Sequence, residues 1–295
     1  MIKKITVFTP TYNREKLLAR LYDSLCAQSS NDFIWLIVDD RSTDNTEHVV
    51  RGWIDEQKIQ IQYLYKKNGG MHTAHNLAYK SIITELNVCI DSDDWMPSNA
   101  IQLITDEWNK VLNKDHIAGI VGLDADKKGN IIGTKIPNHL KCGKFNQLYD
   151  KYGVTGDKKI VLRTDIVQKF ERYPEFEGEK LVPLGILYLM IDQKYDFLYT
   201  NSTFCIVEYQ NEGSSRTIFK QYKQSPKGFA YARKVAIRHS VSFAKTFRSY
   251  SHLISSAIFA SQPRLAFINV NPLLTILAIP FGVILHLYIL IKIKR

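Results

Sequence analysis

Short apolar runs alternate with amphipathic segments along the first half of the chain. The apolar runs have lengths typical of buried strands and lie at 5–9, 33–38, 59–65, 86–90 and 117–123. The segments between them carry apolar residues at helical spacing, at 15–28, 44–57, 71–83 and 98–113. Because the strands are apolar almost throughout, we expect a mostly parallel α/β sheet with helices on both faces.

The pattern changes in the second half of the chain. Glycine and proline interrupt residues 124–156, which predicts loops and a short hairpin. Two further strands are expected at 160–162 and 204–207, flanking a helix at about 179–192, and basic helices are expected at about 220–261. We therefore predict an α/β domain over 1–212, with halves 1–95 and 96–212, followed by a helical tail over 213–295.

Charge separates the predicted domain from the tail. The chain has a net charge of +10, yet no Asp or Glu follows Glu212. Thirteen of the 39 Lys and Arg residues lie in the tail, so residues 1–212 hold 26 basic residues against all 29 acidic ones. A cationic, apolar tail on a mildly acidic body predicts an anionic partner, either a membrane surface or nucleic acid. The long uncharged stretch at 273–291 favours the membrane, so we expect no nucleic-acid partner.

The uncharged stretch 273–291 has three interpretations. As a helix it is roughly 28 Å long at about 1.5 Å per residue, just enough to span a bilayer. Pro280, Gly282 and basic residues on both sides make a simple span unfavourable. We prefer a peripheral or monotopic segment on the cytoplasmic side of the cell membrane. A single span and a buried core or oligomer helix are the alternatives.

Cysteine spacing and the N-terminus indicate the compartment. The four cysteines, Cys26, Cys89, Cys142 and Cys205, form no CxxC pair, which argues against a zinc site or a disulfide scaffold and fits a reducing compartment. The first apolar run is too short for a signal peptide and is followed by Pro10. We therefore expect a protein that is not exported.

Polar residues follow three of the predicted strands. These clusters are Thr9-Pro10-Thr11-Tyr12-Asn13, Asp39-Asp40 and Asp91-Ser92-Asp93-Asp94. Ligands of parallel α/β sheets bind at the carboxyl ends of the strands, so the three clusters are expected to meet at one edge.

Three carboxylates within four residues repel one another at the end of an apolar strand. A divalent cation relieves this repulsion, and hard oxygen ligands suit Mg²⁺ or Mn²⁺. Asp91, Asp93 and Asp94 are the candidate metal ligands, and the sequence does not rank them. The alternative is an acidic loop that closes a strand and precedes a helix.

Four motifs in order resemble family 2 glycosyltransferases of the inverting, bacterial surface-polysaccharide type. They are Thr9-Pro10-Thr11-Tyr12-Asn13-Arg14, Val38-Asp39-Asp40-Arg41-Ser42-Thr43-Asp44, Asn68-Gly69-Gly70 through Asn76, and Asp91-Ser92-Asp93-Asp94. The resemblance covers residues 1–212 and implies the GT-A fold, a Rossmann-like nucleotide-binding sheet with an acceptor-side subdomain. One departure is Arg41, where the family usually has glycine.

The resemblance also implies a site for a nucleotide-sugar, with a UDP-sugar favoured. The implied binding residues are Thr9, Pro10, Thr11, Tyr12, Asn13, Asp39, Asp40, Gly70, His72, Asn76, Asp91, Ser92 and Asp93. Asp40 is the better candidate to accept the N3–H of uracil. Glycines at a helix start favour phosphate, because the backbone approaches closely and its N–H groups are exposed. His72 and His75 are interpreted as packing or phosphate-contacting residues rather than metal ligands.

Inverting transfer requires a general base that takes the proton of the acceptor hydroxyl. The segment Phe176-Glu177-Gly178-Glu179-Lys180 resembles the family's acidic motif, which places Glu179 in the base position. The alternative is that Glu177 and Glu179 only stabilise the N-terminus of a helix. Tyr209 to Ser215 resembles a loop that closes the site.

Three hypotheses follow. The first is a metal-dependent inverting glycosyltransferase that moves a sugar to a lipid-linked or surface-polysaccharide acceptor at the cytoplasmic membrane face. The second is a sugar-1-phosphate nucleotidylyltransferase, which would need a glycine-rich basic loop after the first strand that the chain lacks. The third is a non-catalytic, membrane-binding relative of the glycosyltransferases, which the intact carboxylates argue against.

Overall fold

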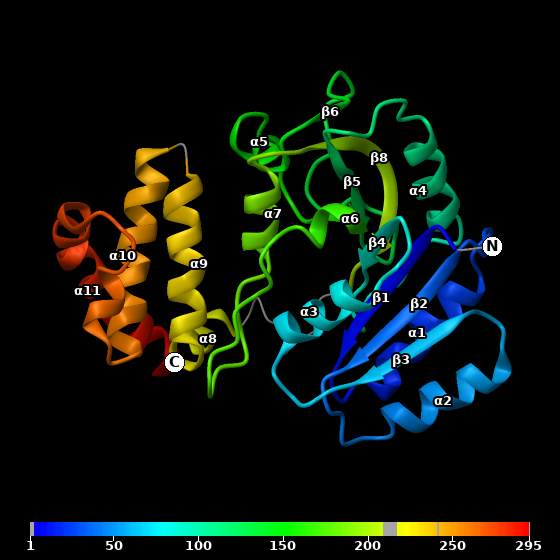
Figure 1. The fold of residues 1–295 in the computed structure, drawn as a ribbon, viewed down its shortest axis with the longest axis horizontal. Coiled ribbons are helices and arrows are strands. Elements are labelled where there is room, and N and C mark those ends of the chain that lie inside the picture. The colour runs from blue at the N-terminus through cyan, green and yellow to red at the C-terminus, as the bar shows by residue number, and fades with distance from the viewer. Residues whose placement is uncertain (1–2, 209–216, 241, 295) are drawn as a thin grey trace. The chain divides into compact units, whose positions relative to one another are not determined.

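The structure, a computed structural model, describes residues 3–208, 217–240 and 242–294 (Figure 1). The chain forms two compact units. The sheet unit comprises Met1–Glu171 and Ile191–Gln210, and the helical unit comprises Arg172–Met190 and Asn211–Arg295. The domain boundary placed at residue 212 stays a prediction, as does the division of residues 1–212 into halves.

The sheet unit is built on one mixed sheet with the strand order β3-β2-β1-β4-β7-β5-β8-β6. Its strands are β1 (Ile5–Thr11), β2 (Phe33–Asp39), β3 (Ile61–Tyr65), β4 (Leu86–Cys89), β5 (Ile117–Ala125), β6 (Cys142–Gly143), β7 (Lys158–Arg163) and β8 (Asp196–Ile206). The first four strands are parallel, as are β5 and β8. β7 runs antiparallel to both β4 and β5, and β6 runs antiparallel to β8. The prediction of a mostly parallel sheet is confirmed.

The first four helices of the sheet unit follow the predicted periodicity, and the last two were not predicted. They are α1 (Glu15–Cys26), α2 (Thr46–Glu56), α3 (Met71–Ser81), α4 (Ala100–Asn109), α5 (Phe145–Asp150) and α6 (Thr164–Val167). Apolar faces of α1 and α4 pack on β1, β2 and β4 in one core that includes Leu18, Trp35 and Trp108. The stacked rings of Tyr22, Trp35 and Trp53 extend this core to α2.

The helical unit contains the basic part of the chain. Its helices are α7 (Gly185–Ile191, of which Ile191 belongs to the sheet unit), α8 (Ile218–Gln224), α9 (Pro226–His239), α10 (Phe243–Phe259), η1 (Pro263–Ala266) and α11 (Pro272–Lys294). The helix predicted at about 179–192 was therefore too long at its start. Pro183 accounts for the difference, because the residue before a proline is disfavoured in helical conformation.

Small side chains mediate the packing of α11 on α10. Thr275, Ala278 and Gly282 are the buried small residues of α11, and a Cβ atom at Gly282 would lie 2.5 Å from the Cβ of Ile254 on α10. On α10 the buried positions include Ser251, Ser255 and Ser256.

The large apolar side chains of α11 are exposed, including Leu273, Ile276, Leu277, Phe281, Ile284, Leu287, Tyr288 and Ile291. Small residues between helices and large apolar residues outside are typical of helices packed within a membrane, because lipid surrounds the outer face. By length and composition, α11 is also able to cross a membrane.

Candidate functional site

The three polar clusters of the sequence meet at the carboxyl edge of the sheet. β1 lies between β2 and β4, so the strand ends are neighbours. Thr11 pairs with Asp39 in the register of β1 and β2, and the amide of Ile90 donates to the carbonyl of Phe8 at 3.0 Å. The strand order confirms the prediction that the three polar clusters meet at one edge of the sheet. The candidate ligand residues therefore lie along that edge.

Asp40 holds the glycine-rich loop in place. Its carboxylate accepts hydrogen bonds from the backbone amides of Gly69 at 2.8 Å and Gly70 at 2.7 Å, and it pairs with the Lys66 ammonium at 2.6 Å. The side-chain amide of Asn68 donates to the carbonyl oxygen of Asp40 at 2.6 Å. The conformation of the glycine-rich loop therefore depends on Asp40, thirty positions before Gly70 in the chain. Sequence reasoning missed Lys66 as the charged partner of Asp40.

Asp39 is fully buried beside it and points into the protein. Its carboxylate accepts from the amide of Ser42 and from the Tyr63 hydroxyl, both at 2.6 Å. Burial and the adjacent Asp39 raise the pKa of Tyr63, so its hydroxyl stays protonated and donates. Asp39 thus fixes the turn after β2.

The turn after β2 contains a side chain in a left-handed conformation. Arg41 has φ 68°, a region that glycine adopts without steric cost, which explains the usual glycine in the resembling family. Asn13, at φ 53°, bonds the same turn: its side chain accepts from the amide of Thr43 at 2.7 Å, and its own amide donates to Ser42 Oγ at 2.8 Å. The loops after β1 and β2 are therefore joined.

Two buried polar atoms at this edge have no hydrogen-bond partner among the described residues. They are Thr11 Oγ1 and Asn68 Oδ1. Buried polar groups in proteins are nearly always hydrogen-bonded, so an orphaned atom beside a glycine-rich loop is an indication of a ligand. The neighbouring Tyr12 side chain is 48% exposed and accessible to such a ligand.

The start of α3 combines glycine with buried polar side chains. Gly70 has φ 93°, and a Cβ atom at Gly69 would lie 2.8 Å from Thr73 Oγ1. The first turns of α3 contain His72 and Asn76, whose side chains are buried. His75 packs edge-on against Phe8 and Tyr79. Its Nδ1 lies 3.0 Å from the Met71 carbonyl oxygen. These contacts give His75 a packing role.

The three carboxylates after β4 have different surroundings. Asp94 is only 6% exposed and points inward, where it accepts from the Cys205 thiol at 3.7 Å and the Glu208 amide at 3.3 Å. Burial, helped by Asp91 and Asp93, raises the pKa of Asp94 to about 7. Asp91 and Asp93 are more exposed. Burial and the charge of Asp91 also raise the pKa of Asp93.

Arg20 of α1 clamps the loop that carries these carboxylates. Its guanidinium lies 3.9 Å from the ring centroid of Trp95, donates to the carbonyl oxygen of Asp93 and pairs with Glu208. Along the chain, Arg20 is 73 positions from Asp93 and 188 positions from Glu208. Helical periodicity therefore showed only that Arg20 lies on α1.

A lysine lies beneath the acidic loop on β7. Lys159 is paired in register with Gly122 of β5, two residues before Asp124, and Asp124 is paired with Cys205 of β8. Burial lowers the pKa of Lys159, but the neighbouring acidic groups, Cys205, Asp124, Asp94 and Asp91, outweigh it and raise that pKa well above its usual value. Lys159 therefore stays charged and offsets part of the repulsion among the carboxylates.

Asp124 of β5 is a further buried carboxylate near the acidic loop. It is 3% exposed, and its Oδ1 has no hydrogen-bond partner within the described chain. Burial raises the pKa of Asp124. Sequence reasoning missed both Asp124 and Lys159, because each lies within an apolar strand and gives no motif.

The donor set at this edge fits a divalent cation. No cluster of three acidic, histidine or cysteine side chains in the described residues forms a complete metal site. Mg²⁺ does not need one, because it is held by one or two carboxylates together with water and substrate phosphates. Asp91 and Asp93 are two hard ligands whose repulsion a cation would relieve, whereas Asp94 is engaged inside the protein.

Glu179 lies in the helical unit and holds the start of α9. Its two carboxylate oxygens accept from the amides of Lys227 at 2.9 Å and Gly228 at 2.8 Å. A negative charge at a helix N-terminus is favourable, so this contact stabilises α9. Glu177 is exposed. The general-base role of Glu179 stays a prediction, and the closing loop predicted at Tyr209 to Ser215 lies outside the described residues.

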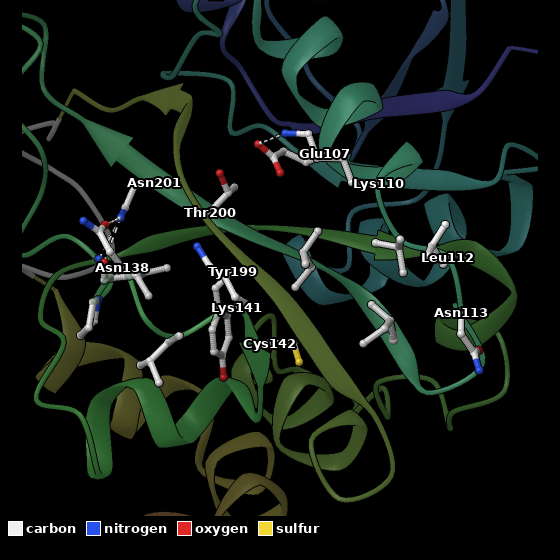
Figure 2. A pocket seen from close by; sticks show the side chains of 16 residues that line it. Glu107, Lys110, Leu112, Asn113, Asn138, Lys141, Cys142, Tyr199, Thr200 and Asn201 are labelled. Atoms are coloured by element: carbon white, nitrogen blue, oxygen red, sulfur yellow. Dashed lines mark hydrogen bonds and ion pairs between the residues drawn. The ribbon is translucent and has the colours of Figure 1, made fainter.

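A cavity of 640 Å³ opens elsewhere in the sheet unit (Figure 2). It is lined by the end of α4, the loop before β6 and residues of β8, including Lys110, Asn138, Tyr199 and Asn201. Ile117 and Leu198, near the amino ends of two parallel strands, also line it. The cavity is therefore at the edge opposite the candidate site.

The fold and the site define an α/β protein with an acidic loop at the carboxyl edge of its parallel strands. The family model described as glycosyl transferase family 2 matches residues 6–162. This match covers more than half of the chain, so the chain belongs to glycosyl transferase family 2, and its predicted class of enzyme, a glycosyltransferase, is confirmed.

Curated relatives match a part of their length. Poly(ribitol-phosphate) beta-N-acetylglucosaminyltransferase TarS of Staphylococcus aureus is 32% identical over 101 residues, which is 34% of this chain and 18% of TarS. Glycosyltransferase GlyA of Streptococcus pneumoniae is 29% identical over 101 residues, 34% of this chain and 14% of GlyA. The matched stretch thus spans less than a fifth of each relative.

Solved structures support the fold over nearly the whole chain. S. aureus TarS 1–349 in complex with UDP-GlcNAc has a TM-score of 0.60 at 17% identity, covering 97% of this chain and 90% of that one. The mannosyltransferase PcManGT from Pyrobaculum calidifontis, in complex with GDP-Man and Mn²⁺, has a TM-score of 0.54 at 15% identity, with coverage of 95% and 73%. The predicted GT-A fold is confirmed.

The loop-holding role of Asp40 is tested by Asp40→Asn. Asparagine keeps one acceptor but places an N–H₂ group against a backbone amide and removes the charge that pairs with Lys66. We expect the free energy of unfolding of the sheet unit to fall by about 2 kcal/mol or more, because hydrogen bonds to a charged group are lost. Urea unfolding measures this change. Asp23→Asn, at an exposed position on α1, is the control, and equal stability of the two variants would contradict the role.

The charge of Lys159 is tested by Lys159→Met. Removing the cation leaves the carboxylates without compensation, so we expect the free energy of unfolding to fall by about 1 to 3 kcal/mol, the cost of leaving buried polar groups without a partner. Adding Asp124→Asn should restore part of the loss, because it removes one of the repelling charges. Lys128→Met, at an exposed position, serves as the control in the same unfolding measurement. A double variant no more stable than Lys159→Met would refute the compensation.

Proposed function

We propose that this protein is an inverting glycosyltransferase that moves a sugar from a UDP-sugar to a lipid-linked or surface-polysaccharide acceptor at the cytoplasmic face of the membrane. The observation that carries the proposal is the meeting of three groups at one sheet edge of a family 2 domain. These groups are the loop after β1, the Asp40-held glycine loop and the acidic loop after β4.

The donor is proposed to lie along this edge. The orphaned Thr11 Oγ1 and Asn68 Oδ1 supply polar contacts, and the exposed ring of Tyr12 supplies a surface for the base. The choice of a UDP-sugar is supported by the fold shared with TarS, whose solved structure is in complex with UDP-GlcNAc. Asp40 remains our candidate for the uracil N3–H, in addition to its contacts with the glycine loop.

Asp91 and Asp93 are proposed to hold Mg²⁺ or Mn²⁺, with Asp94 supporting the loop from inside. Bound there, the cation would stabilise the negative charge that develops on the departing diphosphate. Arg20 fixes the backbone of the loop, and Lys159 limits the repulsion beneath it. A sugar-1-phosphate nucleotidylyltransferase is disfavoured because β1 is followed by Tyr12 and Asn13 rather than a glycine-rich basic loop.

The membrane location is supported by the helical unit. α11 presents large apolar side chains outward and small ones toward α10, the arrangement expected in lipid. Lys292 and Lys294 end this helix with charges that favour an anionic lipid surface. We propose a peripheral or monotopic association through α11, with a single span as the alternative.

The metal assignment is tested by Asp93→Asn. The Asp93 side chain is partly exposed, so the fold should persist while Mn²⁺-dependent hydrolysis and transfer of UDP-sugars are lost. Thermal shift with UDP and Mn²⁺ provides a second measurement, since saturating ligand near 100 times Kd stabilises by about 2.7 kcal/mol. Asp115→Asn, at an exposed position, is the control. Full activity of Asp93→Asn would remove Asp93 from the metal site.

The base assignment is tested by Glu179→Gln. A general base contributes a factor of about 10² to 10⁴, so turnover should fall by that amount while UDP binding stays near normal. Glutamine also weakens the contact with the start of α9, so the melting temperature is measured beside turnover, and Glu177→Gln is the control. A variant that loses stability but keeps its turnover per folded molecule would leave Glu179 with only its structural role.

A further inference from the structure

A cluster of basic side chains in the helical unit has no acidic partner in the tail. The cluster consists of Arg233 of α9 and of Arg248 and His252 of α10, beside Tyr222 of α8; we call it the Arg233 cluster. Arg248 and His252 are four residues apart and lie on the same face of α10. The rings of Tyr222 and His252 are 5.8 Å apart between centroids, and Tyr222 also packs against Phe229 of α9 at 4.5 Å.

Arg233 is the inner member of the cluster. Its Nε is buried and has no hydrogen-bond partner among the described residues. Burial and the neighbouring Arg248 lower the pKa of Arg233 despite the adjacent Tyr222. Burial together with Arg233 and Arg248 lowers the pKa of His252 to about 3, so His252 is neutral at physiological pH. The cluster therefore holds two guanidinium charges, and neither is paired with a carboxylate among the described residues.

The sequence of the tail contains no acidic residue that could neutralise these two charges. No Asp or Glu follows Glu212, so the helices that form the cluster offer no carboxylate. A partly buried guanidinium without a counter-ion is unfavourable, and a planar guanidinium binds phosphate through two parallel hydrogen bonds. The exposed Arg248 leaves the cluster open to solvent on one side. These properties fit a bound phosphate group better than a purely structural role.

The apolar helix lies next to the cluster across α8. Phe219 of α8 packs against Tyr288 of α11, with ring centroids 6.0 Å apart, and Tyr222 of the same short helix contacts His252. Exposed apolar side chains of α11, such as Leu287 and Ile291, therefore belong to the same helical assembly as the cationic cluster. A lipid combines both chemistries, because it has a phosphate headgroup and apolar chains.

We propose that the Arg233 cluster is a phosphate-binding site that takes the headgroup of an anionic phospholipid, with the acyl chains against α11. Arg233 and Arg248 would donate to the phosphate oxygens, and His252 and Tyr222 would form the wall of the site. The site is independent of the donor site of the sheet unit, so it stands or falls without reference to sugar transfer.

The test compares Arg233→Met and Arg248→Met with Arg264→Met in the full-length protein. Arg264 is exposed on η1, so its variant has the same charge change outside the cluster. Binding is measured to vesicles of phosphatidylcholine with and without phosphatidic acid. Both cluster variants should bind the acidic vesicles about tenfold or more weakly, as expected for the loss of hydrogen bonds to a charged group, whereas Arg264→Met should change little.

Thermal unfolding separates a ligand site from a structural arginine. Without anion, Arg233→Met should be at least as stable as the wild type, because methionine removes an unpaired buried charge. Inorganic phosphate should raise the melting temperature of the wild type but not that of Arg233→Met.

Competition of phosphate with the acidic vesicles would place both at one site, and stabilisation by phosphate without cluster-dependent vesicle binding would overturn the lipid assignment. A cluster variant that matches Arg264→Met in vesicle binding and phosphate response would refute the site.

Discussion

Repulsion among like charges at the end of β4 is the constraint on which the site depends. Asp91, Asp93 and Asp94 follow one apolar strand, and Asp124 of β5 adds a fourth carboxylate, which is buried. The structure limits the cost by placing Lys159 beneath them and by turning Asp94 inward. The residual charge is left on Asp91 and Asp93, where a divalent cation and a diphosphate would be attracted.

A second electrostatic arrangement organises the opposite side of the same edge. The carboxylate of Asp40 accepts hydrogen bonds from two backbone amides and pairs with one ammonium group. These contacts fix the glycine loop at the start of α3. Because such charge-assisted hydrogen bonds are about twice as strong as neutral ones, the loop is held before any ligand arrives. The helical unit shows the converse case, in which Arg233 and Arg248 lack any acidic partner within the tail and therefore favour an external anion.

Much of this molecule was predictable from local pattern. Apolar runs and helical spacing located β1 to β5 and α1 to α4 within a few residues, because period and length are properties of short segments. They missed α5 and α6, and they placed the start of β8 at 204 rather than at Asp196. The orientation of β7 was not predictable, since an apolar strand such as 160–162 carries no sign of its direction. The start of α7 was placed too early because Glu179 and the turn before Pro183 belong to the approach to the helix rather than to the helix itself.

By itself, the sequence determined the order of β1 to β5 and α1 to α4, the polar clusters that follow β1, β2 and β4, and the acid-free, apolar tail. Only the tertiary structure decided which charges meet. It brought Lys159 and Asp124 beneath Asp94, Arg20 onto Trp95, Glu179 onto the start of α9, and Arg233 beside Arg248. The physical reason is that periodicity acts over neighbouring residues, whereas electrostatic partners are chosen by strand pairing and helix packing between segments far apart in the chain.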